Sequence, residues 1–274
     1  MSAPEAAAPA ALPHSRPAPP RPAAPAPAAP APEPPLAGEV SEHGSSQRAS
    51  VRLLTWRVLG AAKVLGKVEV GSLDVNGLLS IGGDLIGGDA RVRGSFSTVG
   101  QTRLTGRLSV TGQARCAASI EAGEAEFEGR AELSASLKVH GPLEIRGQLS
   151  VAGALDAQLL RFNGALAVTG AVRAREVDGT LEGVTHLASL TADRVQLRRP
   201  SFPPWKRGGS FRAERIDAKE VRLEAAHVEY LCAQEIRLGP DCHVSRAEGT
   251  IVERHRSSVV GYESSSPPPP GHFR

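Results

Sequence analysis

Two groups of side chains have the types that could hold a metal ion. Cys232 and Cys242 lie near His227 and His243, and thiolate and imidazole groups are ligands that zinc prefers. The cysteines are too far apart in the sequence for a zinc knuckle, and no second pair exists. The second group is an acidic run: Glu121, Glu124, Glu126 and Glu128. Carboxylate oxygens that converge would suit a hard cation, but a strand would separate these side chains along its length. No histidine lies among them either. We therefore expect neither a metal site nor a cofactor.

Two histidines, His140 and His186, are the candidates for a general base in the repetitive part of the chain. A hexapeptide-type acyltransferase would need such a base between its coils. In those enzymes glycine directly follows the apolar residue, whereas here it follows the second apolar residue after one spacer, as in Leu143–Gly147. The sequence contains no Ser-His-Asp or Cys-His spacing and no phosphate-binding glycine loop before a helix. We therefore expect no enzyme.

The most basic part of the chain surrounds a segment rich in proline and glycine, residues 200–211. Phe202, Trp205 and Phe211 could stack on bases, but such a segment provides no rigid platform for them. The net charge of +3 is also too small to indicate nucleic acid. We predict a solubilising or inter-subunit loop, with Trp205 as a possible partner contact. The surrounding basic residues are Arg194, Arg198, Arg199, Lys206, Arg207, Arg212 and Arg215.

The elements that would position these side chains repeat in hexads. Each hexad has two apolar residues around a spacer, followed by a spacer and often glycine, as in Leu73, Val75 and Gly77. This alternation and break indicate a short strand that ends in a bend. Six hexads, one of them short, make a unit of thirty-five residues, and residues of the same type recur at this interval. One series is apolar: Val92, Phe127, Phe162 and Leu197. Another consists of glycines at a predicted corner: Gly94, Gly129 and Gly164.

A repeat of this kind predicts an all-β fold, a single parallel β-helix or β-solenoid with about 17–18 residues per coil. Every second residue would point into a narrow core and contact its counterpart in the next coil. Cys116 falls in an inward position and is predicted to be a small core residue. Only 4% of the residues are aromatic, which suits a thin aliphatic core.

The predicted organisation has five parts. Residues 1–50 contain thirteen of the twenty-two prolines, mostly with alanine, and are expected to be a disordered tail and a spacer or docking arm for a proline-binding protein. Residues 51–199 form coils with an N-terminal cap and 200–211 the loop. Residues 212–262 form the last coils, and 263–274 a second disordered tail.

The apolar cluster at residues 51–64 has two interpretations. It is either the first coil or cap of the solenoid, or an interfacial membrane segment with Trp56 at the headgroups and Arg57 on anionic lipid. Three cysteines, no apolar run of eighteen residues and no secretory signal favour the cytoplasm, with association to a membrane surface as the alternative.

The repeats, the Arg-Arg/Pro/Trp interruption, and then Leu223-Glu224 and Gly239-Pro240-x-Cys242 resemble the bactofilin family over about residues 65–260. The resemblance is greatest to its longer branch, the polymer-forming cytoskeletal proteins. It implies a right-handed β-helix that polymerises without nucleotide through its coil ends, with disordered tails outside the helix.

The ends of a solenoid expose unpaired backbone groups and an open apolar core, and such edges pair with another chain unless charge, proline or a cap blocks them. No helical cap is evident in the sequence. We predict end-to-end self-assembly into filaments or scaffolds, or alternatively a non-polymerising scaffold at a membrane or protein partner. The residues expected at the ends are Leu65, Val68 and Val70, and Ile236, Leu238, Val244 and Ile251.

Overall fold

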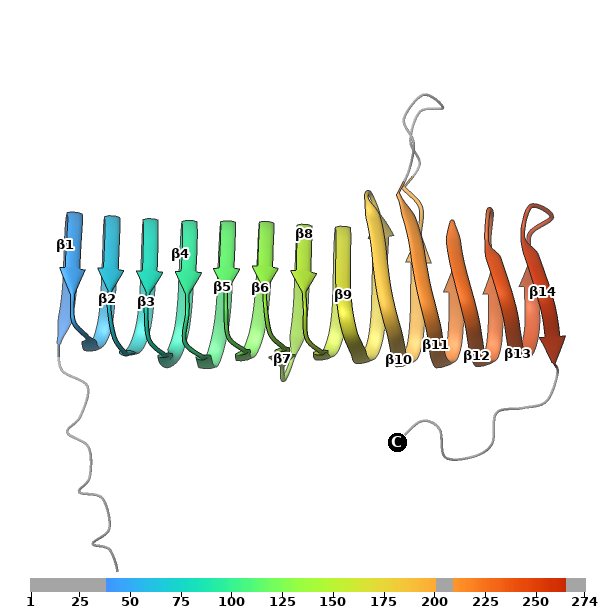
Figure 1. Ribbon diagram of the computed structural model, residues 1–274, viewed down its shortest axis with the longest axis horizontal. Coiled ribbons are helices and arrows are strands. Elements are labelled where there is room, and N and C mark those ends of the chain that lie inside the picture. Colours follow the sequence, from blue (N-terminus) through green and yellow to red (C-terminus); the bar gives the residue numbers. More distant parts are fainter. Residues whose placement is uncertain (1–37, 201–208, 265–274) are drawn as a thin grey trace, which may run out of the picture. The chain divides into compact units, whose positions relative to one another are not determined.

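The computed structural model describes residues 38–200 and 209–264, and these form a β-solenoid. Their strands make one 14-stranded sheet in which neighbouring strands run parallel, so the chain winds in about 13 turns. The coils stand side by side in a single row from β1 to β14 (Figure 1). The described residues contain no helix, and therefore none that is long and apolar enough to cross a membrane. The predicted fold class is confirmed.

The strands are mostly longer than one face of a coil because each continues around a corner. Their bounds are β1 Glu39–Arg48, β2 Val51–Val64, β3 Val68–Ile81, β4 Leu85–Thr98, β5 Thr102–Cys116, β6 Ile120–Leu133, β7 Leu137–Val139, β8 Pro142–Val151, β9 Leu155–Leu181, β10 Val184–Arg198, β11 Ser210–Leu223, β12 Ala226–Leu238, β13 His243–Arg254 and β14 Val259–Ser264.

Side chains at the same register position in successive coils form files along the rod. One file consists of Val92, Val110, Phe127, Ile145 and Phe162. Val92 and Phe127 therefore lie two coils apart, which confirms the predicted unit of thirty-five residues. All five side chains are at most 4% exposed, and a buried aliphatic side chain of this size contributes about 1.5–3 kcal/mol.

A second file consists of glycines that turn one corner of the coils. Gly94, Gly129 and Gly164 have φ angles of 132°, 115° and 138°, a region that is sterically open only to glycine. The coils approach closely here, and a Cβ on Gly129 would lie 2.3 Å from the carbonyl oxygen of Gly112. The corner predicted from the sequence is confirmed. The intervening coils contribute Gly112 and Gly147 to it, and the preceding coil contributes Gly77.

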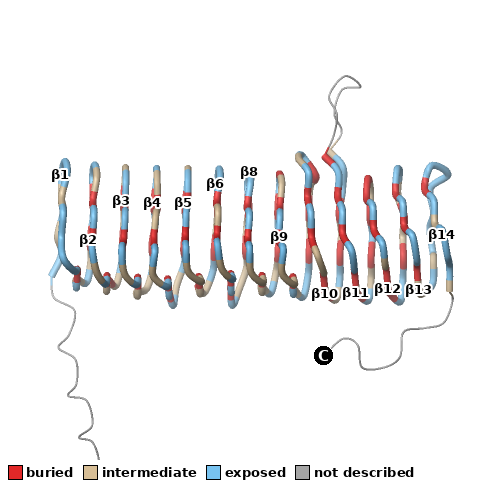
Figure 2. The backbone as a smooth tube through the Cα atoms, in the orientation of Figure 1, coloured by how far each residue is buried: buried red, intermediate tan, exposed pale blue. Residues whose placement is uncertain are grey.

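Coil length changes after the interruption. The step from Leu73 to Ala90 is 17 residues and the step from Ala90 to Leu108 is 18, as predicted. Between β11 and β12 the step shortens to 15, since Val221 pairs with Ile236. Both parts alternate buried and exposed positions along each coil (Figure 2).

The solenoid begins earlier than the sequence predicted. Glu39–Arg48 was expected to belong to a disordered tail but forms β1, which pairs with β2 over ten positions. The predicted loop is also shorter at its end, because β11 starts at Ser210 and buries Phe211. The second predicted tail, residues 263–274, also begins later, because β14 extends to Ser264. Residues 1–37, 201–208 (including Trp205) and 265–274 lie outside the described residues.

Candidate functional site: the two ends of the solenoid

The two ends are the places where the described backbone leaves a strand edge open. Among the described residues β1 pairs only with β2, and β14 pairs only with β13. β14 covers His243–Glu248 and leaves the last part of β13, including Ile251 and Arg254, without a described strand above it. Such edges carry unpaired N–H and C=O groups that can pair with another chain.

The first coil places charge at two positions that are aliphatic in the coil beside it. Glu42 and Arg48 stand in register with Val58 and Val64, each 1% exposed, and form an ion pair with each other. Burial opposes ionisation of Glu42, but its hydrogen bond and charge interaction with Arg48 help to hold the pKa of this carboxyl below its usual value. The pair therefore lies as a polar layer over the end of the apolar core.

The last coil has the same feature. Arg254 stands in register with Leu238, and Glu263 with Ala247, both of which are buried. The Arg254 Nη1 atom lies 2.6 Å from Glu263 Oε1. Arg254 and Glu263 are both well exposed, so the pair contributes at most about 1 kcal/mol to stability. Each end of the described solenoid thus carries one arginine–glutamate pair in core register.

Most residues predicted at the ends lie elsewhere. Val68 and Val70 are in the third coil, fully covered by β2 and β4, so their predicted position at an end is wrong. Leu65 is 54% exposed between β2 and β3. The prediction misplaced this end because β1 lacks the apolar spacing by which a coil is recognised.

At the C-terminal end the prediction was nearer. Ile236 and Leu238 pair with strands on both sides, and Val244 is covered by Val260 of β14. These three are interior residues and their predicted end position is wrong. Ile251 is partly buried against the core and has no described strand above it, so it does lie at the edge.

The predicted membrane contact of Trp56 is wrong. Trp56 is fully buried and stacks between Val40 and Leu73 in the second coil. Arg57 points outward, and its Nε lies 3.8 Å from Asp74 Oδ2. β2 is therefore neither a terminal cap nor a membrane segment but an interior coil.

The acidic run lies on an outward face and pairs with cations of neighbouring coils. Glu121 accepts hydrogen bonds at 2.9 Å from His140 and 3.2 Å from Lys138, which lower its pKa. Glu126 pairs with Arg107 at 2.8 Å. No group of three metal-ligating side chains occurs among the described residues.

The histidines near the C-terminal end form part of one outward file with Arg212. His186 is in register with Arg212, Arg212 with His227, and His227 with His243. The rings of His227 and His243 stack with their centroids 4.9 Å apart. Of the nearby cysteines, Cys242 lies in the core, and Cys232 is buried in register with Asp217 and Glu248.

The three cysteines are buried free thiols. Burial raises the pKa of Cys116 to about 12, and burial is also the main cause of the raised pKa values of Cys232 and Cys242. Cys242 donates to the carbonyl oxygen of Leu223 at 3.2 Å. A thiolate is the reactive form, so these groups are protected from oxidation and alkylation.

The basic residues around the interruption are largely ion-paired where they are described. Arg198 contacts Asp178 at 2.9 Å, Arg199 contacts Asp241 at 2.8 Å, and Arg194 contacts Glu220 at 3.0 Å. Phe211, one of the three aromatic residues considered for base stacking, is 1% exposed and belongs to the core.

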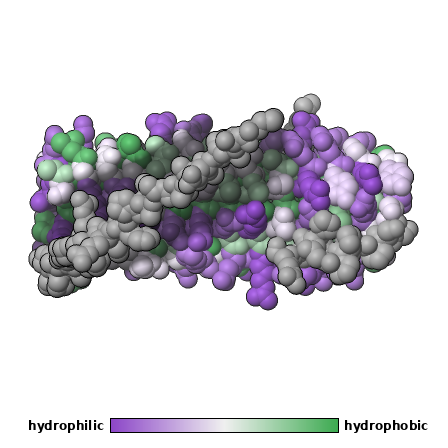
Figure 3. Space-filling view, turned by 60° about the horizontal axis from the view of Figure 1, so that its bottom comes forward, coloured by the Kyte–Doolittle hydropathy of each residue, from purple (hydrophilic) through white to green (hydrophobic). Residues whose placement is uncertain are grey.

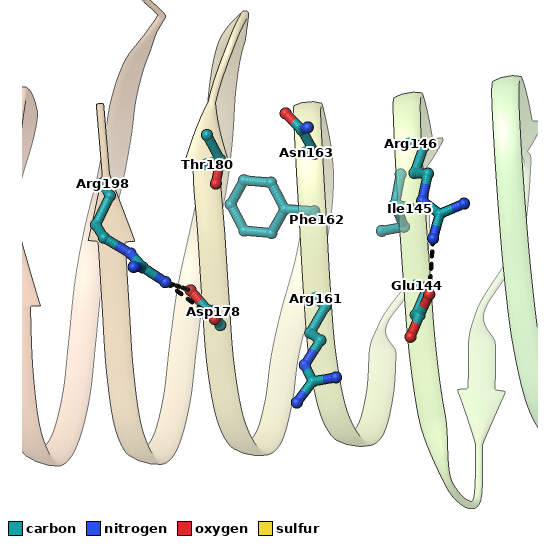
Figure 4. Close-up of a pocket in the computed structure, with 9 residues that line it drawn as sticks. All are labelled: Glu144, Ile145, Arg146, Arg161, Phe162, Asn163, Asp178, Thr180 and Arg198. Carbon is teal, nitrogen blue, oxygen red and sulfur yellow. Dashed lines mark hydrogen bonds and ion pairs between the residues drawn. The ribbon is translucent and has the colours of Figure 1, made fainter. Parts of the chain in front are cut away.

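One shallow cavity of about 310 Å³ lies on the face formed by β8, β9 and β10. Phe162 is among the residues that line it (Figure 4). A Cβ on Gly179 would lie 2.3 Å from Phe162 Cζ, so the ring occupies space that this glycine leaves open. The charged groups on the rim of the cavity pair with their neighbours, Arg198 with Asp178 and Arg146 with Glu144. Hydrophilic residues also cover much of the surface seen in Figure 3.

Comparison with known proteins gave no match to a family model, a curated protein or a solved structure.

Proposed function

We propose that this chain is a structural rod that joins further copies of itself through its two terminal coils, forming filaments or scaffolds without a nucleotide. The observation that carries the proposal is the open strand edge at both ends of a continuous parallel ladder. Strand addition at such an edge satisfies the backbone groups and extends the core. The proposal includes a cytoskeletal role in the cytoplasm, which the resemblance to the bactofilin family implies.

Three features support a mechanical rather than a chemical role. The core files run through the coils, so each coil is supported by its neighbours along the rod. The thiols are buried, and the described acidic and basic side chains mainly pair between coils. A rod of this kind resists bending, and its unpaired strand N–H and C=O groups lie at its ends.

A second candidate is a rod that does not polymerise, and the terminal ion pairs favour it. Charges that point inward at the edge of a sheet oppose association of that edge with another. Glu42–Arg48 and Arg254–Glu263 would in this case act as caps, and the rod would serve a partner along its side.

Analytical ultracentrifugation and negative-stain microscopy of the full chain over a range of concentrations distinguish the two candidates. We expect filaments or concentration-dependent oligomers whose long axis continues the rod. A monomer at all concentrations would refute self-assembly and support the capped rod.

A matched pair of variants locates the contact. Ile251 lies over the core at the open edge of β13, whereas its neighbour Val252 is 53% exposed on the side of the coil. We expect Ile251→Lys to abolish assembly and Val252→Lys to leave it intact, with circular dichroism unchanged in both. Loss of assembly in both variants, or in neither, would contradict a contact through the coil ends.

A further inference from the structure

The two ends of the solenoid present different charges on the same file of core side chains. Glu42 stands over Val58, and the register continues through aliphatic and aromatic side chains and Gly179 to Leu238 and Arg254. The file therefore begins with a carboxylate and ends with a guanidinium. A charged residue in core register would be costly inside the rod but tolerable where water reaches it.

The neighbouring file ends in apolar side chains at both ends. Val40 stands over Trp56 at the first coil, and Ile251 stands over Ile236 at the last. Both side chains are partly buried and pack against the core. If a second copy continued the stack, Val40 of that copy would lie over Ile251, and the apolar file would continue without a gap.

We infer that the rods join head to tail, with the first coil of one copy stacking in register on the last coil of the next. This inference rests on the proposed function, because it assigns the polarity of the same end contact. Glu42 would then lie over Arg254 at the strand spacing of about 4.8 Å, as each residue lies over its counterpart within the rod.

The remaining charges fit the same arrangement. Arg48 already pairs with Glu42, and Glu263 already pairs with Arg254. Bringing the two pairs together gives two acids and two bases in one layer, with no excess charge to bury. Inward charges oppose the association of sheet edges when they are unpaired, but here each charge would have an opposite charge across the junction.

Contact between like ends lacks this continuity. A two-fold axis would make the meeting strands antiparallel, whereas the paired strands of the described solenoid run parallel from the first coil to the last. It would also pair the first coil with itself, so the Val40 file could not continue into Ile251. Head-to-tail contact preserves strand direction, core register and charge complementarity together.

Charge reversal at one end tests the polarity. Glu42→Arg places an arginine opposite Arg254, and Arg254→Glu places a glutamate opposite Glu42, and like charges across a contact are repulsive. Glu229→Arg and Arg161→Glu are the matched controls, because both residues are exposed on interior coils of the rod. Sedimentation velocity gives the assembly state, and circular dichroism verifies folding.

Head-to-tail contact predicts that either single variant is monomeric where the wild type assembles, with a critical concentration raised at least ~10-fold. The mixture of both variants should assemble again, because each junction then joins an arginine at position 42 to a glutamate at position 254, or the native pair. The controls should assemble as the wild type does.

Contact between like ends predicts a different pattern. Each single variant would retain one intact type of junction and would stop at dimers instead of monomers. This result, with an assembling wild type, would overturn the polarity and leave self-assembly standing. A monomeric wild type would instead overturn the proposed function and this inference with it.

Discussion

The glycine corner gives the sharpest test of the stacked architecture. Gly129 lies in the middle of the rod with φ of 115°, and a Cβ there would lie 2.3 Å from the carbonyl oxygen of Gly112. Alanine at such a φ costs about 1–3 kcal/mol in backbone strain alone. A close carbon–oxygen contact is about 3.3 Å long, so the two coils would also have to separate by about 1 Å. We expect Gly129→Ala to lower the free energy of unfolding by at least ~4 kcal/mol.

Two further glycines serve as controls. Gly141 is also mid-rod but has no positive φ, and its nearest approach is 2.9 Å, to the carbonyl oxygen of Gly123. Gly44 has φ of 87° but nothing within 4 Å, since it lies in the terminal coil. We expect Gly141→Ala and Gly44→Ala each to be destabilising, but by less than Gly129→Ala. Gly141→Ala has the close contact without the strained φ, and Gly44→Ala has the strained φ without the contact.

Denaturant unfolding followed by far-ultraviolet circular dichroism measures these differences, and hydrogen exchange locates them along the rod. If Gly129→Ala is no less stable than Gly141→Ala, the corner does not depend on close contact between coils, and steric exclusion of a Cβ is not the reason for glycine at this position.

Two predictions concern titratable groups. The Cys116 thiol, with its pKa raised to about 12 by burial, should not react with an alkylating reagent at neutral pH until the chain unfolds, and rapid labelling of the folded protein would contradict the core position. The hydrogen bond from Tyr230 to Glu248, 2.6 Å long, together with burial raises the pKa of Tyr230 from 10.0 to about 12. Because the folded-state pKa is the higher one, this bond contributes stability below about pH 10 that is lost as the pH rises to about 12. In a Tyr262→Phe background, which leaves one tyrosine, absorbance titration should show the raised pKa, and an unshifted value would contradict the bond.

The fold was largely predictable from the sequence because a solenoid repeats a local pattern. Alternation of apolar residues such as Val92 and Phe96 determines which side chains face inward, and glycines such as Gly94 determine where the coil turns. Cys116 fitted the same pattern and lies in the core as predicted. Each of these decisions depends only on neighbours within one or two coils.

The candidate site was less predictable, because the terminal coil does not follow the pattern. β1 has Glu42 and Arg48 at positions that are aliphatic in the next coil, so the sequence of Glu39–Arg48 resembles a polar linker. Without β1 the predicted end moved inward to Val68 and Val70. The basic residues near the interruption were similarly ambiguous, since their acidic partners are distant in the sequence, as Asp241 is from Arg199.

The sequence by itself therefore determined the period, the inward face and the glycine corner, because these are set by steric and hydrophobic preferences that act over a few residues. Only the tertiary structure decided where the ladder starts and stops, and that Glu42 and Arg254 end the same file. The reason is that a coil is stabilised by the coil beside it. A charged residue in core register can be identified as the end of the stack only when the stack beneath it is known.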